Sequence, residues 1–189
     1  MNTLLNAPLR SARLDLEPLE GHHAAALFDG LAHAGLYDFI PDNPPALDSL
    51  TKRYTLLERR SSPDGTQAWL NWALKRRDDG CYCGYIQATV DHTTRSVSIA
   101  YLVFVPYGGK GFGREAVTAM LEHLNAHGCA DRFEAQIDRR NVRSIALVEA
   151  LGFKRFHEVE DADFFKGATS HEVHFELAAQ PQLQPKATT

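Results

Sequence analysis

The sequence predicts an α+β domain in which a mixed, mostly antiparallel sheet is flanked by helices. The first half holds several strand-like runs, and two of them, residues 82–90 and 95–105, are separated by a short polar break typical of an antiparallel hairpin. The second half alternates strand, loop, helix, strand, helix and strand, which places helices against the faces of a sheet. A chain of 189 residues is about one domain long.

The elements are expected in the following order. Alternation of Leu14 and Leu16 with charged residues predicts a first strand over residues 11–18. Leucines at helical spacing predict two helices, joined by an aromatic and proline-rich link. The remaining hydrophobic runs predict further strands and helices. The expected ranges are helices at 20–34 and 47–60, strands at 67–76, 82–90 and 95–105, a helix ending at Gly128, a strand at 132–138, a helix from Asn141 to Gly152, and strands near 153–159 and 170–177. We expect one domain over residues 1–178 and a disordered polar tail over 179–189.

Bulk properties narrow the classes of function. The net charge of −4 and the isoelectric point near 6.1 argue against a general nucleic-acid or acidic-membrane binder. Apolar runs are too short for a membrane-spanning helix, and the first residues do not resemble an export signal. Three cysteines, Cys81, Cys83 and Cys129, form no C-x-x-C pair and are expected to be reduced thiols. We therefore expect a cytoplasmic protein.

The spacing of His123 and His127 on one predicted helix raises the question of a metal site. No glutamate follows His123 as in H-E-x-x-H, and both histidines fall outside the apolar stripe of that helix. We expect solvated surface side chains here and no metal.

The most informative segment is the glycine-rich loop Gly108–Gly113, between a β-branched strand and an amphipathic helix. A glycine turn that opens a helix presents unpaired N–H groups and the positive end of the helix dipole to a phosphate. A P-loop would need Ser or Thr after Lys110, and the spacing of the glycines also differs from the Rossmann pattern. A nucleotide-binding protein is thus a distant possibility, and the loop predicts a pyrophosphate cradle.

A second motif, Asn141–Phe153, combines a good N-cap, one apolar helix face and a glycine at the helix end. In this order and separation, the two motifs resemble the coenzyme A-binding core of the GNAT family of N-acetyltransferases, although Gly108 replaces the usual large first residue of the loop. The chain is most similar to the branch that includes the ribosomal-protein N-terminal acetyltransferases. That closer resemblance rests on three features: Arg13-Leu14-x-Leu16-x-Pro18-Leu19, Tyr107, and Asp163-Phe164-Phe165-Lys166-Gly167.

The resemblance implies that acetyl-CoA is the co-substrate and that a primary amine attacks its thioester directly. The acceptor would be a protein N-terminus or a small-molecule amine, and the oligomeric state is not implied. The residues that the resemblance assigns to the cofactor are Leu102, Val103, Gly109, Lys110, Gly111, Phe112, Gly113, Arg114 and Asn141. Those proposed to line the acceptor cleft are aromatic: Tyr37, Phe39, Phe164 and Phe165.

The proton-transfer groups are less defined. Many family members carry a tyrosine that protonates the thiolate at the position filled here by Val148, so Ser144 is the nearest substitute, unless it only caps its helix. Asp163 and Glu134 are the two candidates for the general base. The structural alternative for Asp163 is an ordinary turn residue, and that for Glu134 is an outward-facing polar residue of a strand. Because Val148 and Gly108 depart from the pattern, a non-catalytic acyl-CoA-binding or sensor module is the rival to an N-acetyltransferase.

Overall fold

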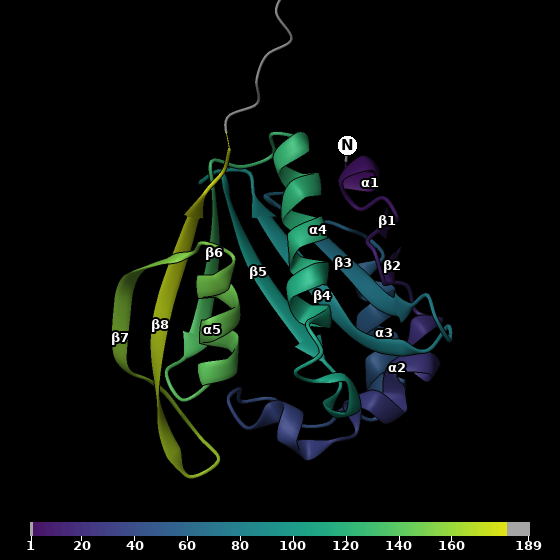
Figure 1. Ribbon diagram of the computed structural model, residues 1–189, viewed down its shortest axis with the longest axis horizontal. Helices are drawn as coiled ribbons and strands as arrows, with labels where there is room; N and C mark the ends of the chain where they lie inside the picture. Colours follow the sequence, from purple (N-terminus) through teal and green to yellow (C-terminus); the bar gives the residue numbers. More distant parts are fainter. Residues whose placement is uncertain (1, 181–189) are drawn as a thin grey trace, which may run out of the picture.

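The computed structural model describes residues 2–180 and has an eight-stranded open sheet of order β1-β2-β3-β4-β5-β6-β8-β7 (Figure 1). Every neighbouring pair is antiparallel except β5 and β6, which are parallel. The strands are β1 Leu9–Arg10, β2 Leu14–Pro18, β3 Gln67–Arg76, β4 Tyr82–Asp91, β5 Ser96–Val103, β6 Arg132–Asp138, β7 Lys154–Phe165 and β8 Ala168–Ala178. The predicted fold class, and the β4–β5 hairpin within it, are confirmed.

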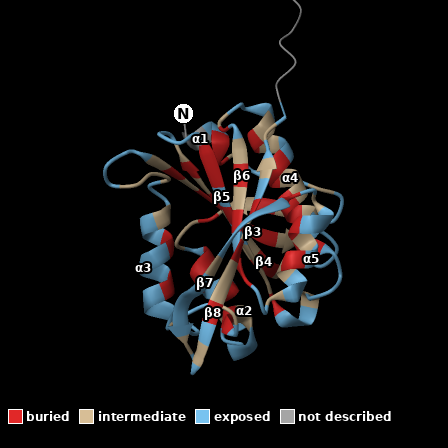
Figure 2. Cartoon of the chain, turned by 90° about the vertical axis from the view of Figure 1, so that its left-hand side faces the viewer, coloured by how far each residue is buried: buried red, intermediate tan, exposed pale blue. Residues whose placement is uncertain are grey.

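Helices cover both faces of this sheet (Figures 1 and 2). Their bounds are α1 Asn2–Leu5, α2 His23–Leu31, α3 Leu47–Leu57, α4 Phe112–Ala126 and α5 Val142–Ala150, with short 3-10 turns at Ala34–Tyr37 (η1) and Val105–Tyr107 (η2). The buried side chains of α4 and α5 belong to the main hydrophobic core, and those of α2 and α3 form a second core on the other face. The sheet therefore separates two hydrophobic cores, one on each face.

The alternation of β4 decides which side chains reach each face. Ile86, Ala88 and Val90 are buried in the main core, on the side of α4 and α5. Tyr85 and Gln87 alternate with these residues along the strand, so they point to the other face, toward α2 and α3. The side chains of Tyr85 and Gln87 thus project from the middle of a central strand into the space under α2 and α3.

Strands β5 and β6 separate halfway along β5. Their parallel pairing covers only Ser96–Ser98 against Arg132–Glu134, whereas β5 continues to Val103. Beyond Ser98, β5 is paired on its other side only, with Leu102 opposite Tyr85 in β4. The backbone groups of Val103 face away from β4 and are consequently left without a strand partner. Those of Leu102 point toward Tyr85 in β4, because the N–H of Phe104 donates to the carbonyl of Cys83 and hydrogen-bonded pairs alternate along the hairpin, so the expectation that the backbone of Leu102 is free is wrong.

The last hairpin differs from the prediction. We expected a loop between strands near 153–159 and 170–177, but β7 and β8 run on and meet in a two-residue turn at Lys166-Gly167. Both turn residues have positive φ, 52° and 76°, which matches the twist of the flanking strands and allows so tight a connection. Asp163 therefore lies in a strand, opposite Ser170, instead of in a loop.

Smaller differences lie at the termini. The expected helix at 20–34 is divided into α2 and the 3-10 turn η1, and no pattern in the sequence indicated α1 or β1. The expected tail begins at residue 179, yet the N–H of Ala179 still donates to the carbonyl of Asp131, and that of Gln180 to the side chain of Asn125. The rest of that predicted tail, residues 181–189, lies outside the described residues.

Candidate active site

The loop before α4 presents a row of free backbone donors. Among residues 2–180, no acceptor lies within hydrogen-bond distance of the N–H groups of Gly109 through Arg114. Gly111, the N-cap residue of α4, has φ 81° and ψ 2°, a left-handed conformation that glycine adopts without strain. Because these donors gather at the positive end of a 15-residue helix, the segment has the properties of an anion-binding cradle.

The side chains of the loop do not all face this row. Phe112 is 7% exposed and packs in the main core, so only its N–H is available to a ligand. Lys110 is exposed, with its Nζ 5.6 Å from the centre of the Tyr107 ring. The cradle is accordingly a backbone feature, and the missing large side chain at Gly108 leaves it intact.

Arg13 braces the cradle from the turn before β2. Its Nη1 donates to the carbonyl of Lys110 at 3.1 Å, its Nε donates to Glu115 at 2.7 Å, and its guanidinium lies 4.5 Å from the centre of the Phe112 ring. Burial would raise the pKa of Glu115, but hydrogen bonds from Ser11 and Arg13 outweigh it and hold that pKa below its ordinary value. The pair keeps a carboxylate in the first turn of α4 neutralised, so the N-terminus stays suited to an anion.

Asn141 caps α5, as predicted. Its Oδ1 accepts a hydrogen bond from the N–H of Ser144 at 3.2 Å, while its NH₂ group has no partner in the described part of the chain. The hydroxyl of Ser144 is likewise without a hydrogen bond among the described residues, so Ser144 does not cap the helix. Its hydroxyl is therefore available for chemistry.

The turn that carries Asn141 is fixed by Asp138 at the end of β6. Its carboxylate accepts from the backbone and guanidinium of Arg140 and from the Ser170 hydroxyl, the last at 2.7 Å. Burial would raise the pKa of Asp138, but these hydrogen bonds lower it to about 2. An ionised carboxylate thus ties β6, β8 and the start of α5 together.

Two further residues define the face of α5. Val148 is fully buried in the main core, so the helix offers no proton donor at this position. Tyr101 of β5 donates from its hydroxyl to the carbonyl of Ser144 at 3.0 Å, and burial raises the pKa of Tyr101 to about 12. Both Ser144 and Tyr101 are thus protonated hydroxyls on the α5 side of the sheet at neutral pH. Sequence reasoning missed Tyr101, although alternation from Leu102 places it on this face.

The two predicted bases have different surroundings. Glu134, in the middle of β6, accepts from Nε of Arg132 at 2.5 Å and is half-buried between β5 and β8. Asp163 is exposed near the tip of the β7–β8 hairpin, where its Oδ1 accepts from the N–H of Phe164. Glu134 is engaged by a cation, whereas Asp163 has no ionic partner among the described residues.

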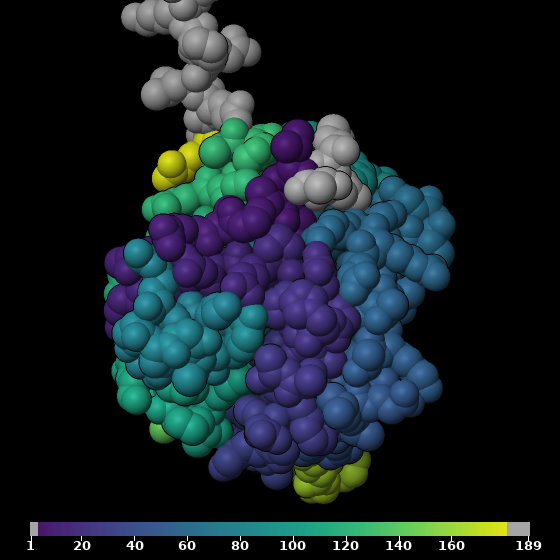
Figure 3. Space-filling model, turned by 90° about the vertical axis from the view of Figure 1, so that its right-hand side faces the viewer, coloured from purple at the N-terminus to yellow at the C-terminus, as the bar shows by residue number. Residues whose placement is uncertain are grey.

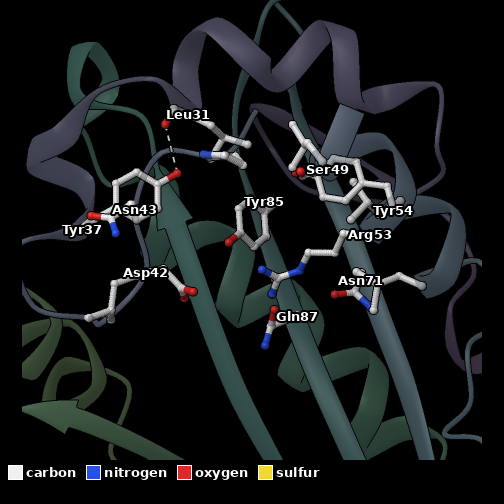
Figure 4. A pocket seen from close by; sticks show the side chains of 15 residues that line it. Leu31, Tyr37, Asp42, Asn43, Ser49, Arg53, Tyr54, Asn71, Tyr85 and Gln87 are labelled. Atoms are coloured by element: carbon white, nitrogen blue, oxygen red, sulfur yellow. Dashed lines mark hydrogen bonds between the residues drawn. The ribbon is translucent and has the colours of Figure 1, made fainter. Parts of the chain in front are cut away.

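A cavity of about 200 Å³ opens on the second face of the sheet, under α3 and the link 34–45 (Figure 4). Leucines of α2 and α3 supply apolar wall, and polar groups enter from α3, the sheet and the link. The polar and aromatic lining residues are Tyr37, Asp42, Asn43, Ser49, Arg53, Tyr54, Asn71, Tyr85 and Gln87. Because Tyr85 lies opposite Leu102, the cavity adjoins the stretch of β5 that has no partner in β6.

Of the aromatic residues proposed for the acceptor cleft, only Tyr37 lines this cavity. Tyr37 is 5% exposed and its hydroxyl donates to the carbonyl of Leu31 at 2.9 Å, so it is also structural. Phe39 and Phe165 are half-buried elsewhere, the latter beneath the guanidinium of Arg140, and Phe164 is 68% exposed. The structure therefore does not bring the four aromatic residues together.

The tyrosines of the cavity are proton donors. Burial raises the pKa of Tyr37 to about 12 and also raises those of Tyr54 and Tyr85, partly offset by the charge of Arg53. The hydroxyl of Tyr54 is buried and has no hydrogen-bond partner within residues 2–180. At neutral pH these groups are uncharged and do not act as bases.

Lys166 attaches the β7–β8 hairpin to the cavity wall. Its ammonium donates to the backbone carbonyls of Tyr37, Ile40 and Asp42, the last two at 2.7 Å. Figure 3 shows the yellow-green hairpin tip at the base of the molecule, beneath the purple and blue N-terminal segments. Asp163 precedes Lys166 by three residues in the same hairpin, but it does not line the cavity.

The side chains that make the cavity polar were missed by sequence reasoning. Arg53 belongs to a helix predicted from its inner positions Leu50, Tyr54 and Leu57. Three other lining residues, Asn71, Tyr85 and Gln87, are polar or aromatic residues within apolar strands. The alternation of β4 was a signal for Tyr85 and Gln87, because it puts both on the face opposite Ile86. Nothing in the local sequence indicated that Asp42 faces them.

The remaining candidates are the histidines considered for a metal site and the three cysteines. His123 is half-buried, and its Nε2 donates to the carbonyl of Leu5 at 2.9 Å, so the expectation of a solvated side chain was wrong because α1 was not foreseen. Within residues 2–180, no group of three His, Cys, Asp or Glu is placed to bind a metal, and no helix there is long and apolar enough to cross a membrane. The cysteines are free, and burial raises the pKa of Cys83 to about 12.

Comparison with known families agrees with this geometry. A family model described as an acetyltransferase (GNAT) domain matches residues 13–154, which include the cradle, the splayed strands and α5. The chain therefore belongs to the GNAT family of acetyltransferases. No curated protein sequence gave a significant match.

Solved structures agree on the fold at low sequence identity. The ribosomal L7/L12 α-N-protein acetyltransferase RimL in complex with coenzyme A is 15% identical, with a TM-score of 0.80, covering 91% of this chain and 98% of that one. An acetyltransferase from Salmonella typhimurium that modifies the N-terminal serine of L7/L12 is 16% identical, with a TM-score of 0.79 and coverages of 92% and 100%. The microcin C7 self-immunity acetyltransferase MccE, in complex with acetyl-CoA and AMP, is 15% identical, with a TM-score of 0.74 and coverages of 88% and 93%. The similarity to the ribosomal-protein branch is thus confirmed for the fold.

Proposed function

We propose that this protein is an acetyl-CoA-dependent N-acetyltransferase that acetylates a primary amine. The observation that carries the proposal is the row of unpaired N–H groups at Gly109–Arg114, at the N-terminus of α4 and beside the open edge of β5. A pyrophosphate needs several converging donors in a place that backbone can approach closely, and this loop supplies them. The residues present therefore fit the co-substrate that the family uses.

Each part of the site has a proposed role in holding acetyl-CoA. The N–H groups of the cradle bind the pyrophosphate, and the free backbone groups of Val103 bind the pantetheine arm. The NH₂ group of Asn141 remains available to the same arm, because only its Oδ1 caps α5. When bound, acetyl-CoA supplies the activated acetyl group.

The proton-transfer roles follow from protonation and position. Ser144 is proposed to donate a proton on the α5 side, since its hydroxyl is free among the described residues and lies on the helix that Asn141 caps. Asp163 is proposed to accept the proton of the amine from the cavity side, where Lys166 holds the hairpin. Glu134 is the weaker candidate because Arg132 already pairs with it.

The test combines binding with turnover. Acetyl-CoA or CoA should raise the melting temperature of the protein, since a ligand of the folded state stabilises it by mass action. A panel of small amines and peptides, with CoA release measured by a thiol reagent, should then identify acceptors. Stabilisation by CoA without acetylation of any amine would instead favour the non-catalytic acyl-CoA-binding module, and the buried Val148 is the feature that would explain it. Absence of any stabilisation by CoA would reject both.

A further inference from the structure

The cavity is lined by one arginine, Arg53 of α3, which is an exposed residue and lies at the cavity opening. No hydrogen bond or ion pair satisfies the side chain of Arg53 within the described part of the chain, although most other arginines there have one. In Figure 4 its guanidinium points from α3 into the space between Tyr85 and Gln87. Its charge also acts on the hydroxyls of Tyr54 and Tyr85, which agrees with that position. A guanidinium presents a planar fork of donors that matches a carboxylate in two parallel hydrogen bonds.

Two amides lie in the same part of the cavity. Asn71 is 5% exposed, and its side-chain amide makes no hydrogen bond among the described residues. Gln87 is half-buried, and its amide also has no hydrogen-bond partner there. Both come from the sheet beneath Arg53 (Figure 4). Neither amide is among the sealed, unsatisfied groups of the described residues, so both are accessible from the cavity and can donate to a group that enters it. Arg53, Asn71 and Gln87 together therefore form an unfilled set of donors for an anion.

The opposite side of the cavity carries the opposite charge. Asp42, on the link, reaches in from the other side in Figure 4, and its carboxylate has no ion-pair partner within residues 2–180. Lys166 holds the carbonyl of this residue and so fixes the backbone of the link, not the carboxylate. A ligand with one cationic and one anionic end matches Asp42 and Arg53 at once.

From this arrangement we infer that the acceptor is an amine whose molecule also carries a carboxylate, bound by Arg53 with the amides of Asn71 and Gln87. The inference rests on the proposed N-acetyltransferase function and specifies its substrate class. The cavity, at about 200 Å³, lies below the roughly 300–1,000 Å³ of drug-sized ligand sites, so it takes a small group. Leu19, Leu31 and Leu50 line it as well, which favours an apolar side chain beside the carboxylate.

Matched probes test the carboxylate. Leucine and leucinamide share the α-amino position and the side chain, and in leucinamide a neutral amide replaces the carboxylate. A peptide amide beginning Leu-Asp, with its Leu-Asn counterpart, tests whether the carboxylate belongs to an acidic side chain of a peptide. Phosphoethanolamine tests a phosphate in its place. With saturating acetyl-CoA, we expect kcat/KM to be about 10- to 100-fold higher for the carboxylate member of at least one pair, as for a charge-assisted hydrogen-bonded pair.

Arg53→Gln should remove that preference, because kcat/KM for the carboxylate member should fall to the level of its uncharged counterpart. Arg59→Gln is the matched control, because Arg59 is an exposed residue just after α3 that does not line the cavity. Neither variant should alter the stabilisation by CoA.

Direct binding separates this inference from the proposed function. Binding of N-acetylleucine and of the N-acetylated Leu-Asp peptide amide is measured by ligand-detected NMR without acetyl-CoA. At least one of these two compounds should bind more tightly than its uncharged counterpart, and Arg53→Gln should abolish the difference in affinity. Equal binding and equal kcat/KM within both pairs, or a preference for phosphoethanolamine, would overturn the carboxylate assignment while leaving N-acetyl transfer intact. Charge-selective binding with no acetylation would overturn the proposed catalysis alone.

Discussion

Replacement of Gly111 by valine tests the cradle directly. Gly111 has φ 81°, and a valine there must either adopt a left-handed conformation or rotate the loop to avoid it. Its Cβ would also lie 3.4 Å from Nη2 of Arg13, the side chain that braces the loop. Both effects disturb the direction of the N–H groups that begin α4 without touching the core.

The expected magnitudes follow from these contacts. A left-handed conformation costs an L-residue about 1–2 kcal/mol, against a typical domain stability of about 5–15 kcal/mol, so the variant should remain folded. Misdirecting the N–H groups of Phe112 and Gly113 removes two charge-assisted hydrogen bonds of about 1.5–3 kcal/mol each. The affinity for CoA should therefore fall by about 10²- to 10⁴-fold.

Isothermal titration with CoA, together with a thermal melt, measures both effects. Gly65→Val is the matched control, because Gly65 has a similar φ of 73° in the turn before β3 and a Cβ added there would have no neighbouring atom within 4 Å. Both variants should melt about 2–8 °C lower than the wild type, but only Gly111→Val should lose CoA. Wild-type affinity in a folded Gly111→Val protein would refute the cradle.

Four further predictions concern the catalytic and supporting residues. Asp163→Asn should lower turnover by about 10²- to 10⁴-fold with little change in acetyl-CoA affinity, and loss of activity in Glu134→Gln instead would reverse the assignment of the base. Ser144→Ala should lower kcat and leave the melting temperature within about 1–2 °C, since its hydroxyl makes no hydrogen bond among the described residues; unchanged kcat would exclude it as the acid. Lys166→Met should raise the KM for the amine but not for acetyl-CoA, because the link loses its anchor; equal effects on both would contradict this. Asp138 contributes on the order of 2 kcal/mol at neutral pH, because its pKa is about 2 in the folded state; urea titrations should show this stability fully present above pH ~4 and lost toward pH 2, and the same acid dependence in Asp138→Asn would rule it out.

Local sequence was sufficient for the cofactor side of the site. The glycine loop, the capping residue Asn141 and the helix end at Gly152 are each defined by conformational requirements of a few consecutive residues. These features were predicted because short-range chemistry decides them.

The acceptor side depended on contacts between distant segments. Arg53, Asn71 and Asp42 line one cavity because α3 and the link pack against the face of the sheet to which Asn71 of β3 belongs, and no periodicity in any one of these segments indicates the others. The position of Asp163 was decided by the turn at Lys166, whose ammonium binds carbonyls more than 120 residues earlier in the chain. The sequence by itself indicated the family, the fold class and the glycine loop before α4, since each rests on local spacing. Only the tertiary structure decided which charges face the acceptor, because their positions depend on how separate elements pack.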